Sequence, residues 1–141
     1  MAASDPLMRG IILLIAVIAI VSGCNSRTLD KVVVSGEVKF KGQPVSIGKI
    51  TFDPIEGTDG PISGAAIKDG RYMADGKGGV PIGHHKVIIE GFRPPTDETG
   101  KFDPEAGRAQ YLPARFNIAS ELTIEVKPDE SPAVRDFNLD G

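Results

Sequence analysis

The chain has 141 residues, with 16 Lys and Arg against 19 Asp and Glu, one Cys, 17 Gly, 11 Pro and no Trp. This length favours one domain, and a net charge of −3 lacks the basic footprint that nucleic-acid binding requires. A single Cys excludes an intrachain disulfide and any zinc site built from several cysteines. The many Gly and Pro residues favour short strands joined by turns over a helix bundle.

The first part of the chain is predicted to be a secretion signal. Ile11 to Val21 is an unbroken apolar run, shorter than the roughly 20 residues that span a bilayer but suited to the core of a signal peptide. The string Val21-Ser22-Gly23-Cys24 that follows resembles the bacterial lipobox. This resemblance implies that residues 1–23 are removed and that Cys24 is lipidated, which anchors the mature chain in a membrane. An ordinary secretory signal with a free Cys and an uncleaved N-terminal anchor are the alternatives.

Residues 24–31 are predicted to form the lipidated N-terminus and a short tether to a domain over residues 32–141. The segment from Asn25 to Lys31 reaches at most roughly 23 Å, so we expect the domain close to its membrane. Asn directly after the Cys favours the outer membrane under the enterobacterial sorting rule. The expected location is the cell envelope, facing the periplasm or the exterior.

Alternation of apolar and polar residues predicts strands along the rest of the chain. Val32 to Phe40 alternates, with Val34 and Val38 on the buried face, and 49–53 repeats the pattern with Ile50 and Phe52 inward. Asp69-Gly70 is a hairpin signal between two further strands. The seven predicted strands are 32–40, 49–53, 62–67, 71–74, 85–91, 121–127 and 134–139. We expect 76–83 to be a glycine-rich loop, 128–132 a turn, and 105–111 at most one helical turn. This pattern favours a two-sheet sandwich.

Several segments match a known family in order along the chain. Gly36 to Pro44 followed by Ile50-Thr51-Phe52 resembles the opening of carboxypeptidase regulatory-like domains. Later matches are Asp69-Gly70-Arg71-Tyr72, 80–87, 111–116 and Phe137-Asn138-Leu139, although His85 stands where the family has an aromatic residue. The family includes small bacterial lipoproteins of the planctomycete type. The resemblance implies an all-β, seven-stranded Greek-key β-sandwich of the prealbumin (transthyretin)-like kind over 32–141, without catalysis or a cofactor.

The residues with catalytic or metal-binding chemistry form no recognisable site. His84 and His85 are neighbours on one strand and point to opposite faces, so we predict one packed and one exposed histidine and no metal site. Hydroxyisourate hydrolases share the transthyretin-like fold, but their C-terminal Tyr-Arg-Gly-Ser tail is absent, so we expect no enzyme. The acidic residues near 53–59 and 97–105 lack EF-hand spacing and predict a solvated surface.

The candidate binding surface is the long segment from Phe92 to Tyr111. Loops beyond about 15 residues are uncommon in compact domains and are either functional or mobile. Phe92, Phe102 and Tyr111, with Arg93 beside them, are the predicted contact residues. The alternative is a flexible excursion with Phe102 tucked against the sandwich.

The function expected from these features is a membrane-anchored, non-catalytic binding or envelope-scaffold module. Its expected partners are the membrane, through the lipid on Cys24, and envelope proteins or glycans, but no nucleic acid. A carbohydrate-binding module, a hydrolase of the hydroxyisourate type and a carrier of a small ligand at an oligomer interface are the alternatives.

Overall fold

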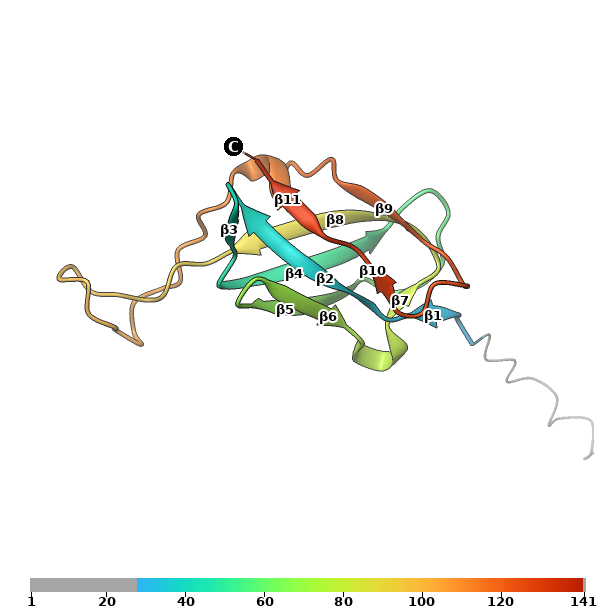
Figure 1. Ribbon diagram of the computed structural model, residues 1–141, viewed down its shortest axis with the longest axis horizontal. Helices are drawn as coiled ribbons and strands as arrows, with labels where there is room; N and C mark the ends of the chain where they lie inside the picture. The colour runs from blue at the N-terminus through green and yellow to red at the C-terminus, as the bar shows by residue number, and fades with distance from the viewer. Residues whose placement is uncertain (1–27, 141) are drawn as a thin grey trace, which may run out of the picture.

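The computed structural model describes residues 28–140, and within them the chain is all-β (Figure 1). The predicted signal 1–23 and the lipidation site Cys24 lie outside the described residues. In chain order, the elements are β1 (Lys31–Val32), β2 (Val34–Phe40), β3 (Gln43–Pro44), β4 (Ile47–Pro54), β5 (Ser63–Lys68), β6 (Arg71–Ala74), the 3₁₀ turn η1 (Gly76–Gly78), β7 (Val80–Pro81), β8 (Gly83–Gly91), the 3₁₀ turn η2 (Ala114–Phe116), β9 (Thr123–Val126), β10 (Ala133–Val134) and β11 (Phe137–Leu139). No helix in this part of the chain has the length and hydrophobicity of a membrane span.

The principal strands form one strongly curled sheet in the order β10-β2-β6-β5-β4-β8-β9, with β3 and β11 also paired to β2. Neighbouring strands are antiparallel, except that β10 and β11 run parallel to β2. A separate two-stranded ladder joins β1 to β7. In Figure 1 the half with β2, β10 and β11 lies in front of the half with β4 and β8. These curled antiparallel sheets agree with the predicted sandwich.

The core lies between the two halves of the sheet and follows the alternation of the sequence. Val34 and Val38 of β2 are fully buried, and so are Ile50 and Phe52 of β4, as predicted. Val87 and Ile89 of β8 complete the opposite wall. Burying a side chain of this size contributes roughly 1.5–3 kcal/mol, so each inward row stabilises the contact between the halves.

Two tight turns shape the sheet through positive backbone angles. Asp69 and Gly70 have φ of 51° and 77° and connect β5 to β6, which confirms the predicted hairpin. Lys41 and Gly42, with φ of 50° and 75°, connect β2 to β3 in the same way. Glycine tolerates this region at no steric cost, and each turn has it at the second position.

The predicted loop 76–83 needs correction. Val80 and Pro81 form β7 and are buried, because β7 pairs with β1 across the end of the core. A Cβ at Gly79 would lie 2.3 Å from the Val32 carbonyl oxygen, so only a glycine allows the two backbones to approach this closely. The glycine that predicts a loop from the sequence therefore serves a packing contact. Residues 105–111 contain no helical turn, which agrees with the expected maximum of one, and a short 3₁₀ turn follows at η2.

Candidate functional site

The segment from Phe92 to Tyr111 is a paired projection, which we call the projecting hairpin (residues 92–111). Figure 1 shows it extending from one end of the molecule, while β1 lies at the opposite end. Phe92 bridges Gln110 and Thr96 bridges Phe102 in antiparallel fashion. Backbone hydrogen bonds from Arg93 N to Ala109 O at 3.0 Å and from Asp97 N to Lys101 O at 2.8 Å join its two arms. The long segment is therefore held by its own pairing.

The base of the hairpin is fixed to the domain by Tyr111. Its backbone N–H donates to the Gly91 carbonyl at 2.9 Å, and its ring centre lies 6.1 Å from that of Phe40. The Arg93 guanidinium lies 5.9 Å from the centre of the Tyr111 ring. Burial raises the pKa of the Tyr111 hydroxyl, which the nearby Arg93 charge partly offsets. Tyr111 and Arg93 therefore act as the support of the hairpin.

The tip of the hairpin is organised by the Asp97 carboxylate. Its Oδ1 accepts hydrogen bonds from Thr99 N at 2.8 Å, Thr99 Oγ1 at 2.6 Å and Lys101 N at 2.9 Å. These bonds, with that of the Thr99 hydroxyl the largest, lower the pKa of Asp97. Asp103 N also donates to Pro95 O at 3.0 Å. A single exposed carboxylate thus closes the turn that carries the neighbouring aromatic ring.

Phe102 stands apart from the other predicted contact residues. It is 71% exposed on the projecting arm, and it takes part in no aromatic pair within residues 28–140. The alternative in which Phe102 tucks against the sandwich is wrong, because the hairpin extends away from the domain. The structure brings Arg93 and Tyr111 together at the base, beside the half-buried Phe92, and leaves Phe102 as a separate apolar point.

The two histidines lie on opposite faces of β8. His85 is fully buried, with Nε2 2.7 Å from the Pro81 carbonyl oxygen and Nδ1 without a hydrogen-bond partner. Burial lowers the pKa of His85, so its imidazole is neutral at pH 7 and donates from Nε2. The side chain of His84 is 48% exposed, and its Nδ1 lies 3.9 Å from the Glu56 carboxylate. The predicted division into one packed and one exposed histidine is confirmed.

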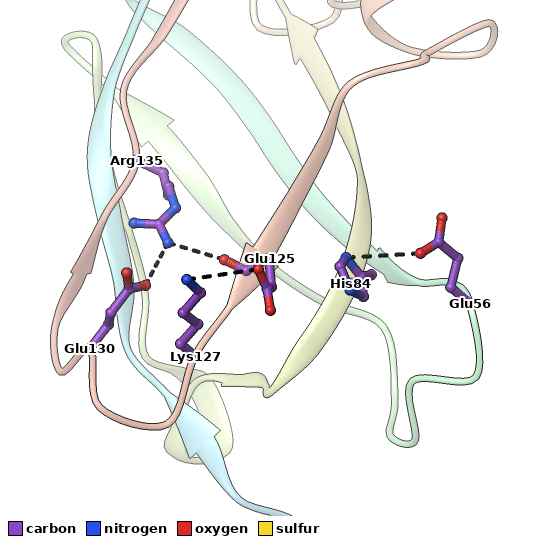
Figure 2. A network of polar contacts seen from close by, with 6 residues as sticks. All are labelled: Glu56, His84, Glu125, Lys127, Glu130 and Arg135. Atoms are coloured by element: carbon purple, nitrogen blue, oxygen red, sulfur yellow. Dashed lines mark hydrogen bonds and ion pairs between the residues drawn. The ribbon is translucent and has the colours of Figure 1, made fainter.

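An open hollow of about 640 Å³ adjoins His84 at the end of the domain that carries β1. Leu29, Ile82 and Val126 contribute apolar atoms, and Glu56, His84 and Lys127 contribute polar groups. Figure 2 shows the polar contacts at and beside this hollow. Lys127 Nζ lies 3.9 Å from the Glu125 carboxylate, and Arg135, outside the lining, contacts Glu130 and the Glu125 carbonyl. Four distant segments form the hollow, so sequence spacing gave no signal for it. No three His, Cys, Asp or Glu side chains gather to hold a metal ion anywhere in residues 28–140.

Comparison with known proteins yields no family. No known family model matches the chain, and no curated protein matches it. Among solved structures, a 9R-lipoxygenase from Cyanothece PCC8801 is similar at a TM-score of 0.36 and 16% identity, over 97% of this chain and 21% of that one. The chain thus spans about a fifth of the length of that enzyme, and a likeness at this TM-score carries no argument about function.

Proposed function

We propose that this chain is a lipid-anchored, non-catalytic binding or scaffold module of the cell envelope, which presents the projecting hairpin to a partner. The observation that carries the proposal is the position of β1 and the hairpin at opposite ends of the long axis (Figure 1). From Cys24 to Thr28 the chain reaches at most roughly 14 Å. A lipid on Cys24 therefore keeps the β1 end against the membrane, with the outer membrane favoured, and directs the hairpin away from it.

The hairpin has the properties of a preformed contact surface. Its pairing and the hydrogen bonds to Asp97 fix its backbone before any partner arrives, which lowers the entropy lost on binding. Phe102 offers a large apolar side chain, and aromatic anchors carry much of the energy of protein interfaces. Four acidic residues and one basic residue surround it between Thr96 and Glu105. These features support an envelope protein with an apolar pocket bordered by cationic side chains.

The arrangement of polar groups supports a non-catalytic role. His85 is enclosed in the core and neutral, so the exposed His84 has no second histidine to work with on its surface. A hydrolase of the hydroxyisourate type needs both histidines in one site. For glycans, stacking favours several exposed rings, and Phe102 is the large exposed aromatic residue among those described. We therefore favour a protein partner over a sugar.

We also propose that the domain is a prealbumin-like Greek key, as the resemblance to carboxypeptidase regulatory-like domains implies. The strand order supports this proposal. β4, β5 and β6 follow one another as hairpins, and β2, which precedes them in the chain, pairs with β6 and not with β4. A Greek key is expected to place one strand beside the far end of three strands that follow one another as hairpins, as β2 lies beside β6 here.

A photocrosslinking experiment in intact cells tests the proposal. The full chain carries benzoylphenylalanine in place of Phe102 or, as a control, of Ile118, which is 92% exposed outside the hairpin. We expect one defined crosslinked protein from position 102 and none from position 118. The crosslink should be lost in Cys24→Ala. The chain that keeps Cys24 should incorporate labelled fatty acid and fractionate with membranes. Equal products from both positions, or an unlabelled chain in the soluble fraction, would contradict the proposal.

A further inference from the structure

The outer face of β6, β2 and β10 carries an exposed apolar strip that the proposed function does not use. Met73 of β6 and Val134 of β10 are each 59% exposed, and they line an open groove with Ala66, Lys68 and Arg71. Both apolar side chains point outward while their chain neighbours Tyr72 and Ala133 are buried in the core. Exposed apolar residues are common singly, but here two share one face.

The strip is ordered in register across the three strands. Met73 is the partner of Ser35, and Ser35 is the partner of Val134, so one row reads Met73, Ser35, Val134. The next row pairs Arg71 with Glu37, and the Asp136 carboxylate accepts a hydrogen bond from Glu37 N at 2.8 Å. Each row thus has a residue of β2 at its centre. In the first row Met73 and Val134 lie on the two sides, and in the second row the positive Arg71 and the negative Asp136 do.

We infer that this face binds a second copy of the chain. The two copies are related by a two-fold axis that lies between their facing sheets, parallel to β2. Rotation about such an axis exchanges the β6 side with the β10 side. Met73 of one copy then faces Val134 of the second copy, and Arg71 faces Asp136 of the second copy. The two sides of the face are therefore complementary to each other, apolar against apolar and Arg71 against Asp136, as an isologous dimer contact requires. The Glu37 side chains of the two copies face each other at the axis, and each is paired with Lys39 and Arg71 of its own copy.

The charges on this face indicate a contact of modest strength. Glu37 lies 3.4 Å from Lys39 Nζ and 3.6 Å from Arg71 within the same copy, and all these groups are in solvent. Pairs of this kind contribute little to affinity but oppose wrong registers. An axis along a strand leaves both copies pointing in the same direction, so both β1 ends face one membrane. That last step rests on the proposed lipid anchor; the contact itself does not.

Site-directed crosslinking between two differently tagged full-length copies in the same cells tests the inference. The probe is a thiol-reactive crosslinker that spans roughly the 10 Å between packed sheets. One copy carries Met73→Cys and the other Val134→Cys. In the inferred dimer these positions face each other, whereas two copies of Met73→Cys lie about 14 Å apart on opposite sides of the axis. Ile118→Cys measures random collision, and the chain with no added Cys measures any reaction of Cys24 itself.

We expect a product with both tags from Met73→Cys with Val134→Cys, at several-fold higher yield than from Met73→Cys with itself, and only background from Ile118→Cys. Adding Arg71→Glu to both copies is expected to reduce the yield several-fold, because it places two acidic groups together. A product in which one copy is joined to a different protein, with no product that carries both tags, would show another protein on this face. Equal yields at all positions would show random collision, and either result overturns the inference. Membrane fractionation of the same cells reports anchoring separately, so loss of the anchor and loss of the contact are distinguishable.

Discussion

The Tyr72 hydroxyl donates a 2.7 Å hydrogen bond to the carbonyl oxygen of Arg135, and so joins β6 to the segment between β10 and β11 across the inner side of β2. Burial, and to a smaller extent the nearby Asp136 carboxylate, raises the pKa of this hydroxyl, which stays protonated as a donor. The bond satisfies a carbonyl at the point where the last strand is interrupted.

Tyr72→Phe is expected to destabilise the domain by about 1–3 kcal/mol, because it leaves the Arg135 carbonyl without its donor while the ring packing remains. Denaturant unfolding of the two proteins measures the difference. Tyr111→Phe is the matched control, since its hydroxyl donates no hydrogen bond within residues 28–140, and it should change little. A Tyr72→Phe variant as stable as the parent would remove this role from the hydroxyl.

Gly36→Ala is expected to destabilise the domain by about 1–3 kcal/mol or more through overpacking. A Cβ at Gly36 would lie 2.0 Å from the Arg135 carbonyl oxygen and 2.9 Å from the Asp136 carboxylate, so the C-terminal segment must move. Gly107→Ala, where a Cβ would meet nothing within 4 Å, provides the control in thermal melts. Equal melting temperatures for the two variants would refute the close approach.

Acidification is expected to weaken the fold through His85. Its pKa is lowered in the folded state by burial, a shift that the neighbouring His84 increases and that Asp53 and the hydrogen bond to Pro81 reduce. Below the ordinary histidine pKa of about 6.5, the unfolded chain binds a proton that the folded chain resists, so stability falls as the pH drops through that value.

Urea unfolding at pH 7.5 and pH 5.5 measures this effect. His85→Leu should lose much of the difference between the two pH values, although it costs stability at both because Pro81 O loses its donor. The exposed His84→Gln should retain the difference. The explanation fails if the His84 and His85 variants respond to pH alike.

Asp97→Ala is expected to open the tip of the projecting hairpin while the domain stays folded. Three hydrogen bonds end on its Oδ1, so the amides of Thr99 and Lys101 should exchange faster with solvent once the carboxylate is gone. The unfolding midpoint should not move, because the tip contributes nothing to the core. Glu98→Ala, at the adjacent exposed position, serves as control. Unchanged exchange at both amides would contradict the assigned role.

The sequence predicts those parts of the fold that depend on neighbouring residues in the chain, namely long strands and tight turns. Alternation identifies Ile50 and Phe52 as core residues, and Asp69-Gly70 identifies a turn that few other residue pairs adopt. The short ladder of β1 with β7 is missed because two-residue strands have no period and exist only through their partners.

The candidate site is predictable to a smaller degree. The length of the segment 92–111 singles it out in the sequence. Its turn depends on the Asp97 carboxylate, which accepts hydrogen bonds from the backbone of the same segment, and composition does not distinguish such an Asp from a solvated one. The predicted contact residues also divide between the base and the tip of the hairpin, because the pairing of its two arms sets where each one lies. These residues are Phe92, Arg93, Phe102 and Tyr111. The exposed Met73 and Val134 follow ordinary strand alternation, and only their register across β2 makes them a strip.

The parallel pairing of β2 with β10 and β11 has a consequence for the order of folding. Partners such as Glu37 and Asp136 are 99 positions apart, so the half of the sheet that contains β2 is completed only when almost the whole domain is available. Such distant pairing slows folding, because the chain must be ordered over its full length before the contact stabilises it. A chain that crosses a membrane N-terminus first would thus complete this half of the sheet only after its last strands have emerged on the far side.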